Sequence, residues 1–147
     1  MGNYATVAQT RIRLDLPNVS LQIEQLAGTN STTVQNTILE QFLEDACGVV
    51  DAYLNNMYTV PVTTAADNNF LRSITLDIAI YEIFKRGSGD DVPKKYRTNY
   101  EDSIRSLEDI AEGSMSVPGV ASKIINTSVE FISDDTVFAE DDLTHYF

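Results

Sequence analysis

Histidine and cysteine, the side chains that most often carry catalysis or bind transition metals, each occur once in this 147-residue chain, as His145 and Cys47. By number alone, a single histidine excludes multi-histidine metal sites. We expect His145 to be a solvated or interface side chain rather than a catalytic base. Cys47 lies within an apolar helical pattern, which favours a small buried side chain over a reactive thiol.

Adjacent aspartates are the next candidates for metal binding or carboxylate catalysis. They occur at positions 90–91, 134–135 and 141–142. None of these pairs has the alternating ligand spacing and the trailing glutamate of a calcium-binding loop, and helix caps and turns explain them as well. We therefore expect no catalytic residue, no metal site and no cofactor, which means that the protein is not an enzyme.

Two further carboxylates, Asp51 and Asp77, lie in or beside apolar helical stripes. A carboxylate in such a place must find a partner or remain solvated at the edge of the core. We favour a structural bond to a helix terminus, a tyrosine or an arginine over a catalytic role. Tyrosine rings in the core can bring their hydroxyl groups near these acids. The expected polar core therefore comprises Asp51, Asp77, Tyr53, Tyr81 and Tyr96.

The composition is that of a folded acidic protein of one domain. Hydrophobic residues make up 43% of the chain, and 10 Lys and Arg stand against 22 Asp and Glu, for a formal net charge of -12. Such a charge repels DNA and anionic lipid. No apolar run approaches the roughly twenty residues of a membrane span. The first residues lack the apolar core of a secretory signal, so we expect the chain to stay in the reducing compartment where it is made.

A long apolar repeat predicts a central helix. It opens with the capping-box spacing of Thr32-Thr-Val-Gln35 and ends before Pro61, which cannot continue a helix. Residues on its expected buried stripe recur at every fourth position: Val34, Ile38, Phe42, Ala46, Val50 and Leu54. Further apolar residues widen the stripe beyond what a surface helix needs, and this width indicates burial at the centre of a bundle.

Two more helices follow in the pattern. The first has cap residues at 67–69 and stops at the glycines of 87–89, and the second starts near Pro93 and closes at Gly113. One face of the second helix is apolar, and Arg105 can neutralise only some of the acids on the other face. That other face therefore forms an acidic stripe, with Glu101, Glu108 and Glu112 as its main members.

The first thirty residues allow two interpretations. Thr6-Val-Ala-Gln9 has the spacing of a capping box, whereas Ile12, Leu14 and Leu16 alternate with polar neighbours as in a strand. We favour a short helix.

Beyond Gly113 the chain changes to β-branched, aromatic and acidic residues, which predict an extended arm over 114–147 with short β segments. Large apolar side chains in such an arm need to be covered by another subunit or a partner. The expected interface residues are Phe131, Phe138, Leu143, Tyr146 and Phe147. The expected fold is thus mainly α, a small bundle of three to four helices over 1–113 followed by the extended C-terminal arm.

Several stretches resemble the signatures of one family. The run Val50-Asp-Ala-Tyr-Leu-Asn-Asn-Met-Tyr-Thr-Val-Pro61 is similar to the pattern ID-x-YL-x-x-RY-x-VP, and Leu76-Asp-Ile-Ala-Ile-Tyr81 is similar to a D-x-A-x-Y helix. Val92-Pro-Lys-Lys-Tyr-Arg97 and Leu107-Glu-Asp-Ile-Ala-Glu-Gly113 follow in the right order, and Tyr4-Ala-Thr6 matches the usual opening. The family is that of the head-to-tail connector, or head-completion adaptor, proteins of tailed bacteriophages, typified by a protein of phage Mu.

The resemblance implies a virion structural protein of the neck, made in the host cytoplasm, which forms a dodecameric ring beneath the portal. Its partners would be the portal protein and a neck stopper or tail completion protein. Genomic DNA would pass through the ring without specific binding, and no membrane would be involved. The arm would contact the portal or neighbouring subunits, and the acidic stripe would face the channel. Met57, Ile80 and Lys95 stand where the family has arginine.

Two other classes of function fit the size and charge. An acidic inhibitor that mimics DNA and binds a basic nucleic-acid enzyme would also be small and negatively charged, but should be a monomer or dimer. A small acidic enzyme would need a pocket of convergent polar groups, and no motif in the sequence indicates one.

Overall fold

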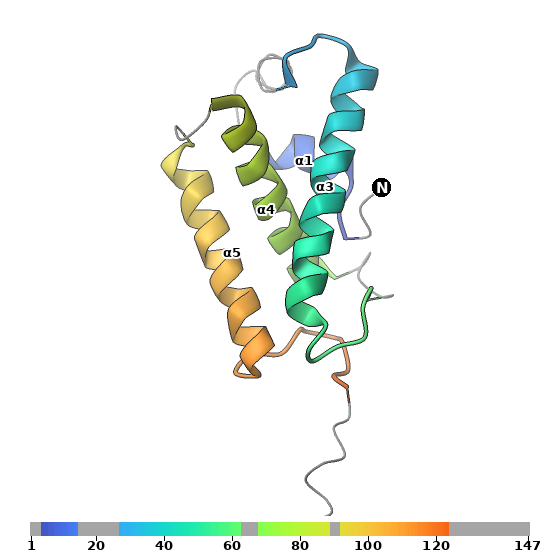
Figure 1. Ribbon diagram of the computed structural model, residues 1–147, viewed down its shortest axis with the longest axis vertical. Helices are drawn as coiled ribbons and strands as arrows, with labels where there is room; N and C mark the ends of the chain where they lie inside the picture. The colour runs from blue at the N-terminus through green and yellow to red at the C-terminus, as the bar shows by residue number, and fades with distance from the viewer. Residues whose placement is uncertain (1–3, 15–26, 63–67, 89–91, 124–147) are drawn as a thin grey trace, which may run out of the picture.

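The computed structural model describes residues 4–14, 27–62, 68–88 and 92–123. These residues form four helices and no strand: α1 (Val7–Arg13), α3 (Thr32–Leu54), α4 (Asn69–Ser88) and α5 (Lys94–Glu112). The three long helices lie side by side, and α1 packs against α3 and α4 (Figure 1). The expectation of a mainly α bundle of three to four helices is therefore confirmed, with four packed helices in the described residues.

Helix α1 begins with the capping box that its sequence predicts. The Thr6 side chain accepts a hydrogen bond from the Gln9 backbone N–H at 3.2 Å, and the Gln9 side chain accepts one from the Thr6 backbone N–H at 2.9 Å. These two bonds satisfy donors that a helix start leaves open. The helical interpretation is correct up to Arg13, and the apolar side chain of Leu14 is then buried.

Helix α3 differs from its prediction at the cap and in the centre of its buried face. Ser31, rather than Thr32, is the N-cap and accepts a hydrogen bond from the Val34 N–H, while the Gln35 side chain turns back to donate to the Thr29 carbonyl. Val34 is 46% exposed. The buried stripe is rotated toward neighbouring positions, namely Gln35, Leu39, Leu43, Ala46, Cys47, Val50 and Leu54. Helix α3 packs on both α4 and α5, and this packing sets the rotation. The periodicity of the apolar residues alone does not specify it.

The ends of α4 and α5 agree closely with their sequence signals. Asn68 caps α4 by accepting hydrogen bonds from the N–H groups of Phe70 and Leu71. Gly113 ends α5 in the left-handed conformation, at φ 86°, where a residue without a Cβ is favoured. Helix α5 starts directly after Pro93, near the predicted position, and no side chain caps this helix.

The core consists of two apolar clusters. The larger one lies toward the end of the bundle where α3 and α5 finish, and includes Leu43, Val50, Leu54, Leu71, Ile74, Leu107, Ile110 and Val117. The smaller one lies toward the other end, and consists of Leu14, Leu39, Ile80, Ile83, Phe84, Val92 and Tyr96. Two stacked ring pairs, Phe84 on Tyr96 and Tyr81 on Tyr100, join α4 to α5 with centroid separations of 4.7 and 4.0 Å.

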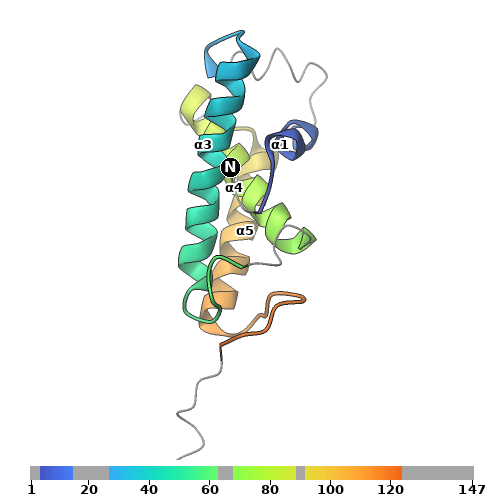
Figure 2. The ribbon, with the colours of Figure 1, turned by 90° about the vertical axis from the view of Figure 1, so that its right-hand side faces the viewer.

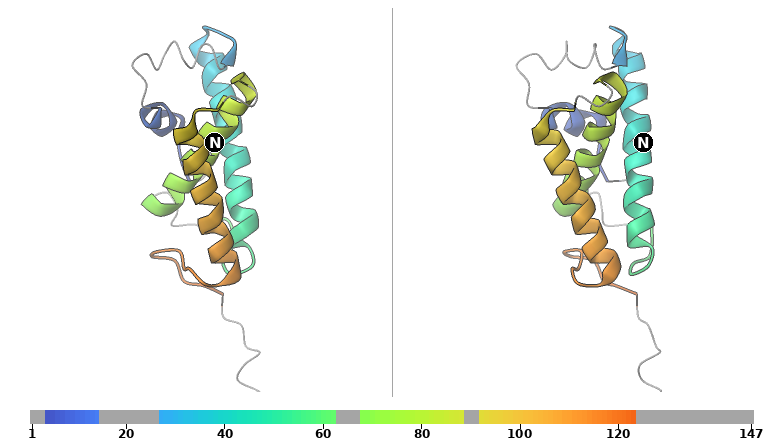
Figure 3. Two further views of the ribbon diagram at one scale, coloured as in Figure 1. Left: turned by 90° about the vertical axis from the view of Figure 1, so that its left-hand side faces the viewer. Right: turned by 60° about the vertical axis from the view of Figure 1, so that its left-hand side comes forward.

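The described start of the expected arm, residues 114–123, packs on the end of its own bundle (Figures 2 and 3). Val117 is buried, and its backbone N–H donates to the Tyr58 hydroxyl at 2.8 Å. The Lys123 backbone N–H donates to the Met57 carbonyl at 2.8 Å. The remainder of the arm, with its expected β segments and its interface residues, lies outside the described residues.

Candidate functional site

A groove of about 480 Å³ lies between α1, α4 and α5. Its buried lining is apolar and comes from Leu76, Ile80 and Tyr96. Around it stand three basic side chains, Arg13, Arg72 and Lys95, together with the single carboxylate of Asp77. Among the described lining residues, the charges of the groove are thus net positive, within a chain whose net charge is -12.

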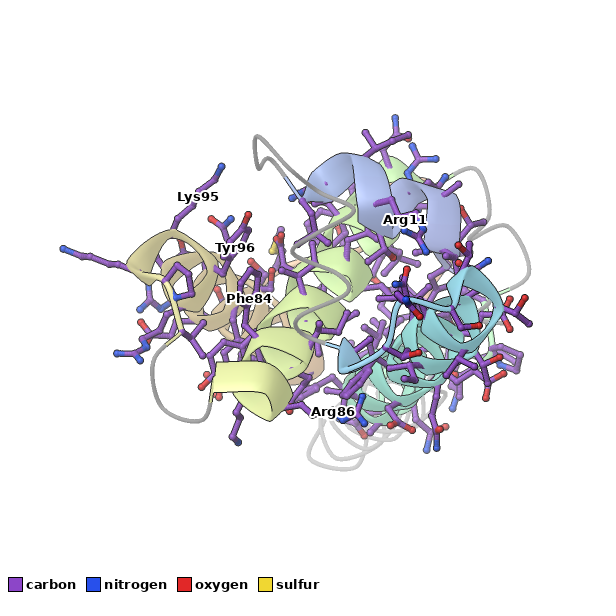
Figure 4. All side chains as sticks on the ribbon, turned by 90° about the horizontal axis from the view of Figure 1, so that it is seen from above. Arg11, Phe84, Arg86, Lys95 and Tyr96 are labelled. Atoms are coloured by element: carbon purple, nitrogen blue, oxygen red, sulfur yellow. The ribbon has the colours of Figure 1, made fainter. Side chains whose placement is uncertain are left out.

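The helix faces around the groove expose further apolar and basic groups. Ile12 of α1 also lines the groove and is 82% exposed, more than any other large hydrophobic side chain in the part of the chain that the structure describes. The Lys95 ammonium lies 5.8 Å from the centre of the Tyr96 ring. In Figure 4, Tyr96 lies beside Phe84, and Lys95 projects from α5 on the side of the molecule where α1 lies. Such a surface can hold an apolar group and a negative charge together.

Asp77 forms one wall of this groove and is held by two helices besides its own. Its carboxylate accepts a hydrogen bond from the Arg13 guanidinium at 2.9 Å and another from the Ser103 hydroxyl at 3.1 Å. Burial raises the pKa of Asp77, and the nearby Arg13 charge and the two hydrogen bonds offset this rise only in part. Arg13 also donates to Ser73 at 3.0 Å, so it ties α1 firmly to α4.

Asp51 has a different kind of partner in the larger cluster. Its carboxylate accepts a short hydrogen bond from the Tyr4 hydroxyl, which in turn accepts one from the Val62 N–H at 3.1 Å. Burial, and then the hydrogen bond to Asp51, raise the pKa of the Tyr4 phenol far above its ordinary value. The chain segment before α1 is thus fastened to α3 by a neutral donor.

The expected polar core is not one cluster. Asp51 and Asp77 bind different partners in different parts of the core. Tyr81 and Tyr96 pack through their stacked rings, and Tyr53 packs at the edge of the larger cluster. Sequence reasoning did not identify Tyr4, Arg13 and Ser103 as partners, because each lies at least 26 positions from the acid that it binds. No local spacing signals such a pair.

The acidic stripe of α5 lies on the surface, since Glu101, Glu108 and Glu112 are all exposed. Arg105 lies on the same helix with its side chain nitrogen 3.7 Å from the Asp102 carboxylate, and both groups are more than half exposed. Such an exposed pair contributes little to stability. The stripe is therefore a negatively charged surface directed at solvent in the single chain.

Within the described residues, no group of three or more His, Cys, Asp or Glu side chains is arranged to hold a metal ion, and Cys47 is buried. No helix in the same part of the chain is long and apolar enough to cross a membrane. His145 and the interface residues Phe131, Phe138, Leu143, Tyr146 and Phe147 lie outside that part.

Comparison with known proteins gives two matches. A family model described as "Bacteriophage Mu, Gp36" matches residues 4–130. A protein of Haemophilus influenzae named "Mu-like prophage FluMu protein gp36" is 31% identical over 96 residues, which cover 65% of this chain and 64% of that protein. The alignment thus spans a little less than two thirds of the relative's length. The family model covers all four helices, including those that form the groove and the acidic stripe.

Proposed function

Because the chain belongs to the bacteriophage Mu Gp36 family, we propose that it is a virion structural protein, the head-to-tail connector adaptor that forms a ring beneath the portal. The ring extends the DNA channel and gives neck or tail proteins a docking surface. The observation that carries this proposal is the exposed acidic stripe of α5 on a strongly acidic helical bundle in a member of a phage family. The protein acts through assembly and needs no catalytic residue or cofactor.

Charge supports the role of a conduit. Twelve copies at -12 each would carry about -144 formal charges, and a negatively charged wall repels the phosphate backbone, so DNA slides past it. In this arrangement Glu101, Glu108 and Glu112 face the channel. The arm of residues 114–147 reaches the portal or a neighbouring subunit beyond the segment that packs on its own bundle.

The direct test is assembly. Mass measurement and electron microscopy of the purified chain, alone and with portal-containing capsids, should show a ring on the portal. A chain that stays a monomer or dimer with portal, and instead binds a basic nucleic-acid enzyme, would contradict the connector role and favour a DNA mimic.

Charge reversal tests the channel. In a phage that carries Glu101→Lys, Glu108→Lys and Glu112→Lys, rings should still form, but DNA ejection should slow because a positive wall attracts phosphate. The matched control carries Glu40→Lys, Glu44→Lys and Asp45→Lys, which make the same charge change on the exposed face of α3. Equal ejection rates in both variants would place the α5 stripe away from the channel.

Truncation tests the arm. Val117 is buried and bonded to Tyr58, so the cut belongs after Lys123 rather than after Gly113. The shortened chain should fold but fail to join the head. Normal occupancy on capsids would move the attachment surface to the helical body.

A further inference from the structure

The charges of α5 run against its helix dipole. Negative charges are favoured near the start of a helix and positive charges near its end. Helix α5 instead begins with Lys94 and Lys95 and has neither an acidic residue in its first turn nor a basic one in its last. Its neighbour α4 follows the rule, with Lys85 and Arg86 in the last turn. Lys94 and Lys95 therefore oppose the helix dipole of α5, and Lys95 lines the groove.

The C-terminal segment, residues 124–147, carries the opposite charge to these lysines. All 10 basic residues and 16 of the acidic residues lie in 1–123, while 124–147 has six acidic residues and no Lys or Arg. Half of the net charge of -12 is therefore concentrated in these last 24 residues. The same segment contains the apolar side chains of Phe131, Phe138, Leu143, Tyr146 and Phe147. Its chemistry, acids between aromatic residues, complements a groove of cations around an apolar floor.

We propose that the groove between α1, α4 and α5 binds the acidic, aromatic segment 124–147 of a second copy of this chain. An aromatic or leucine side chain of the segment covers Ile12, Ile80 and Tyr96, and neighbouring carboxylates lie against Arg72 and Lys95. This contact requires no portal and no DNA, so it does not depend on the connector role.

The place where the segment leaves the bundle favours a second copy over the same chain. The Lys123 side chain donates to the Asn55 carbonyl and its backbone to Met57, just after α3, and no residue of α3 lines the groove. The segment therefore starts on one side of the bundle and the groove lies on another. A contact that joins two different surfaces of identical copies is head-to-tail, the type that can close into a ring. The 24 residues can reach roughly 80 Å when extended. The experiment must therefore also detect a segment that binds the groove of its own chain.

Disulfide trapping in the full-length protein tests the proposal. One copy carries Ile12→Cys and a second, distinguished by a size tag, carries Phe138→Cys, while the native Cys47 is buried and stays in both. Mixed and gently oxidised, the two should form a linked pair about tenfold faster than a control pair in which Val34→Cys replaces Ile12→Cys. Val34 is 46% exposed on α3, outside the groove.

Charge reversal provides the second measurement. Arg72→Glu with Lys95→Glu should slow trapping roughly three- to tenfold, the effect of two exposed charge pairs. Lys85→Glu with Arg86→Glu, the same change at the end of α4, should not. With the Arg72→Glu, Lys95→Glu groove, adding Asp134→Lys and Asp135→Lys to the tagged copy should restore the trapping rate.

Three results would overturn the proposal. The first is a disulfide formed only within a single chain that carries both cysteines, which would place the segment in its own groove. The second is an equal trapping rate at Ile12→Cys and Val34→Cys. The third is a rate of maleimide labelling at Ile12→Cys that stays as high as at Val34→Cys at every protein concentration, because the groove would then be empty or reserved for another partner. A ring that fails to form on portal capsids would contradict the connector role and leave this result standing.

Discussion

The two apolar clusters are closed by different chemistry. At the larger cluster, neutral phenols complete the polar bonds: Tyr4 joins Asp51 to Val62, and Tyr58 receives the Val117 N–H. At the smaller cluster, a charged pair borders the groove, and the Arg13 side chain is 38% exposed while that of Asp77 is 12% exposed. The Arg13 side chain at the smaller cluster therefore remains in contact with water, whereas the Tyr4 and Tyr58 rings at the larger cluster are buried.

The larger cluster contributes mainly to stability, whereas the smaller cluster borders a surface that can bind another molecule. The neutral Tyr4 donor is itself buried, and its loss strands the groups that it bonds. A half-exposed guanidinium keeps part of its hydration, and its neighbours Ile12, Arg72 and Lys95 also line the groove. The smaller cluster therefore tolerates more change in its polar groups, and changes there alter the binding surface.

The largest effect is expected from Tyr4→Phe. This change leaves the Asp51 carboxylate and the Val62 N–H without their shared partner, and should lower the free energy of unfolding by about 2 to 3 kcal/mol. Urea denaturation followed by circular dichroism measures the loss. Tyr53→Phe, which removes a hydroxyl from a half-buried ring of α3, is the control and should cost much less. Equal losses would mean that the Tyr4 bonds do not close the larger cluster.

At the smaller cluster, Asp77→Ala should cost about 1 to 2 kcal/mol, because Ser103 is buried and loses its acceptor while Arg13 can rehydrate. Asp77→Asn should cost far less. The asparagine oxygen can accept from Arg13, and its amide can donate to Ser103. The same urea titration, run on both variants, compares the two. Equal losses for Asn and Ala would show that the charge, rather than hydrogen bonding, holds this wall of the groove.

The stability of the smaller cluster should depend on pH through Asp77. Burial raises the pKa of Asp77 above the ordinary value of 3.8, so between 3.8 and the raised value the folded state binds more protons than the unfolded state. The contribution of Asp77 to stability is therefore greatest below 3.8 and falls as pH rises through this window. Unfolding curves from pH 3 to 7 should show the wild type losing stability relative to Asp77→Asn. A relative gain would mean that Arg13 outweighs burial.

The smallest effect concerns the first turn of α5. Lys94→Glu places a negative charge where the helix dipole favours one, and should raise thermal stability by about 0.3 to 0.5 kcal/mol at low salt. Arg86→Glu makes the same change at the end of α4 and should lower stability by a similar amount. Calorimetry at low and high salt checks both signs, since salt screens the effect. No gain from Lys94→Glu would indicate that this lysine already has a stabilising role in the single chain.

Local signals in the sequence determined most helix ends. The capping box of Thr6 and Gln9, the cap at Asn68 and the left-handed Gly113 each depend on hydrogen bonds between residues at most a few positions apart. Composition likewise determined the acidic surface, because charged side chains that have no buried partner remain in solvent. Family membership also followed from motifs read along the chain.

Tertiary structure alone decided which carboxylate meets which partner and where the groove lies. Tyr4 and Asp51 are 47 positions apart, and Arg13 and Asp77 are 64 apart, so no periodicity of one helix brings them together. The same holds for α3, whose wide apolar stripe permits several rotations until α4 and α5 bury Leu39 and leave Val34 exposed. Sequence patterns encode bonds within a turn of helix, whereas these contacts depend on how whole helices pack, which is set by the fit of many side chains at once.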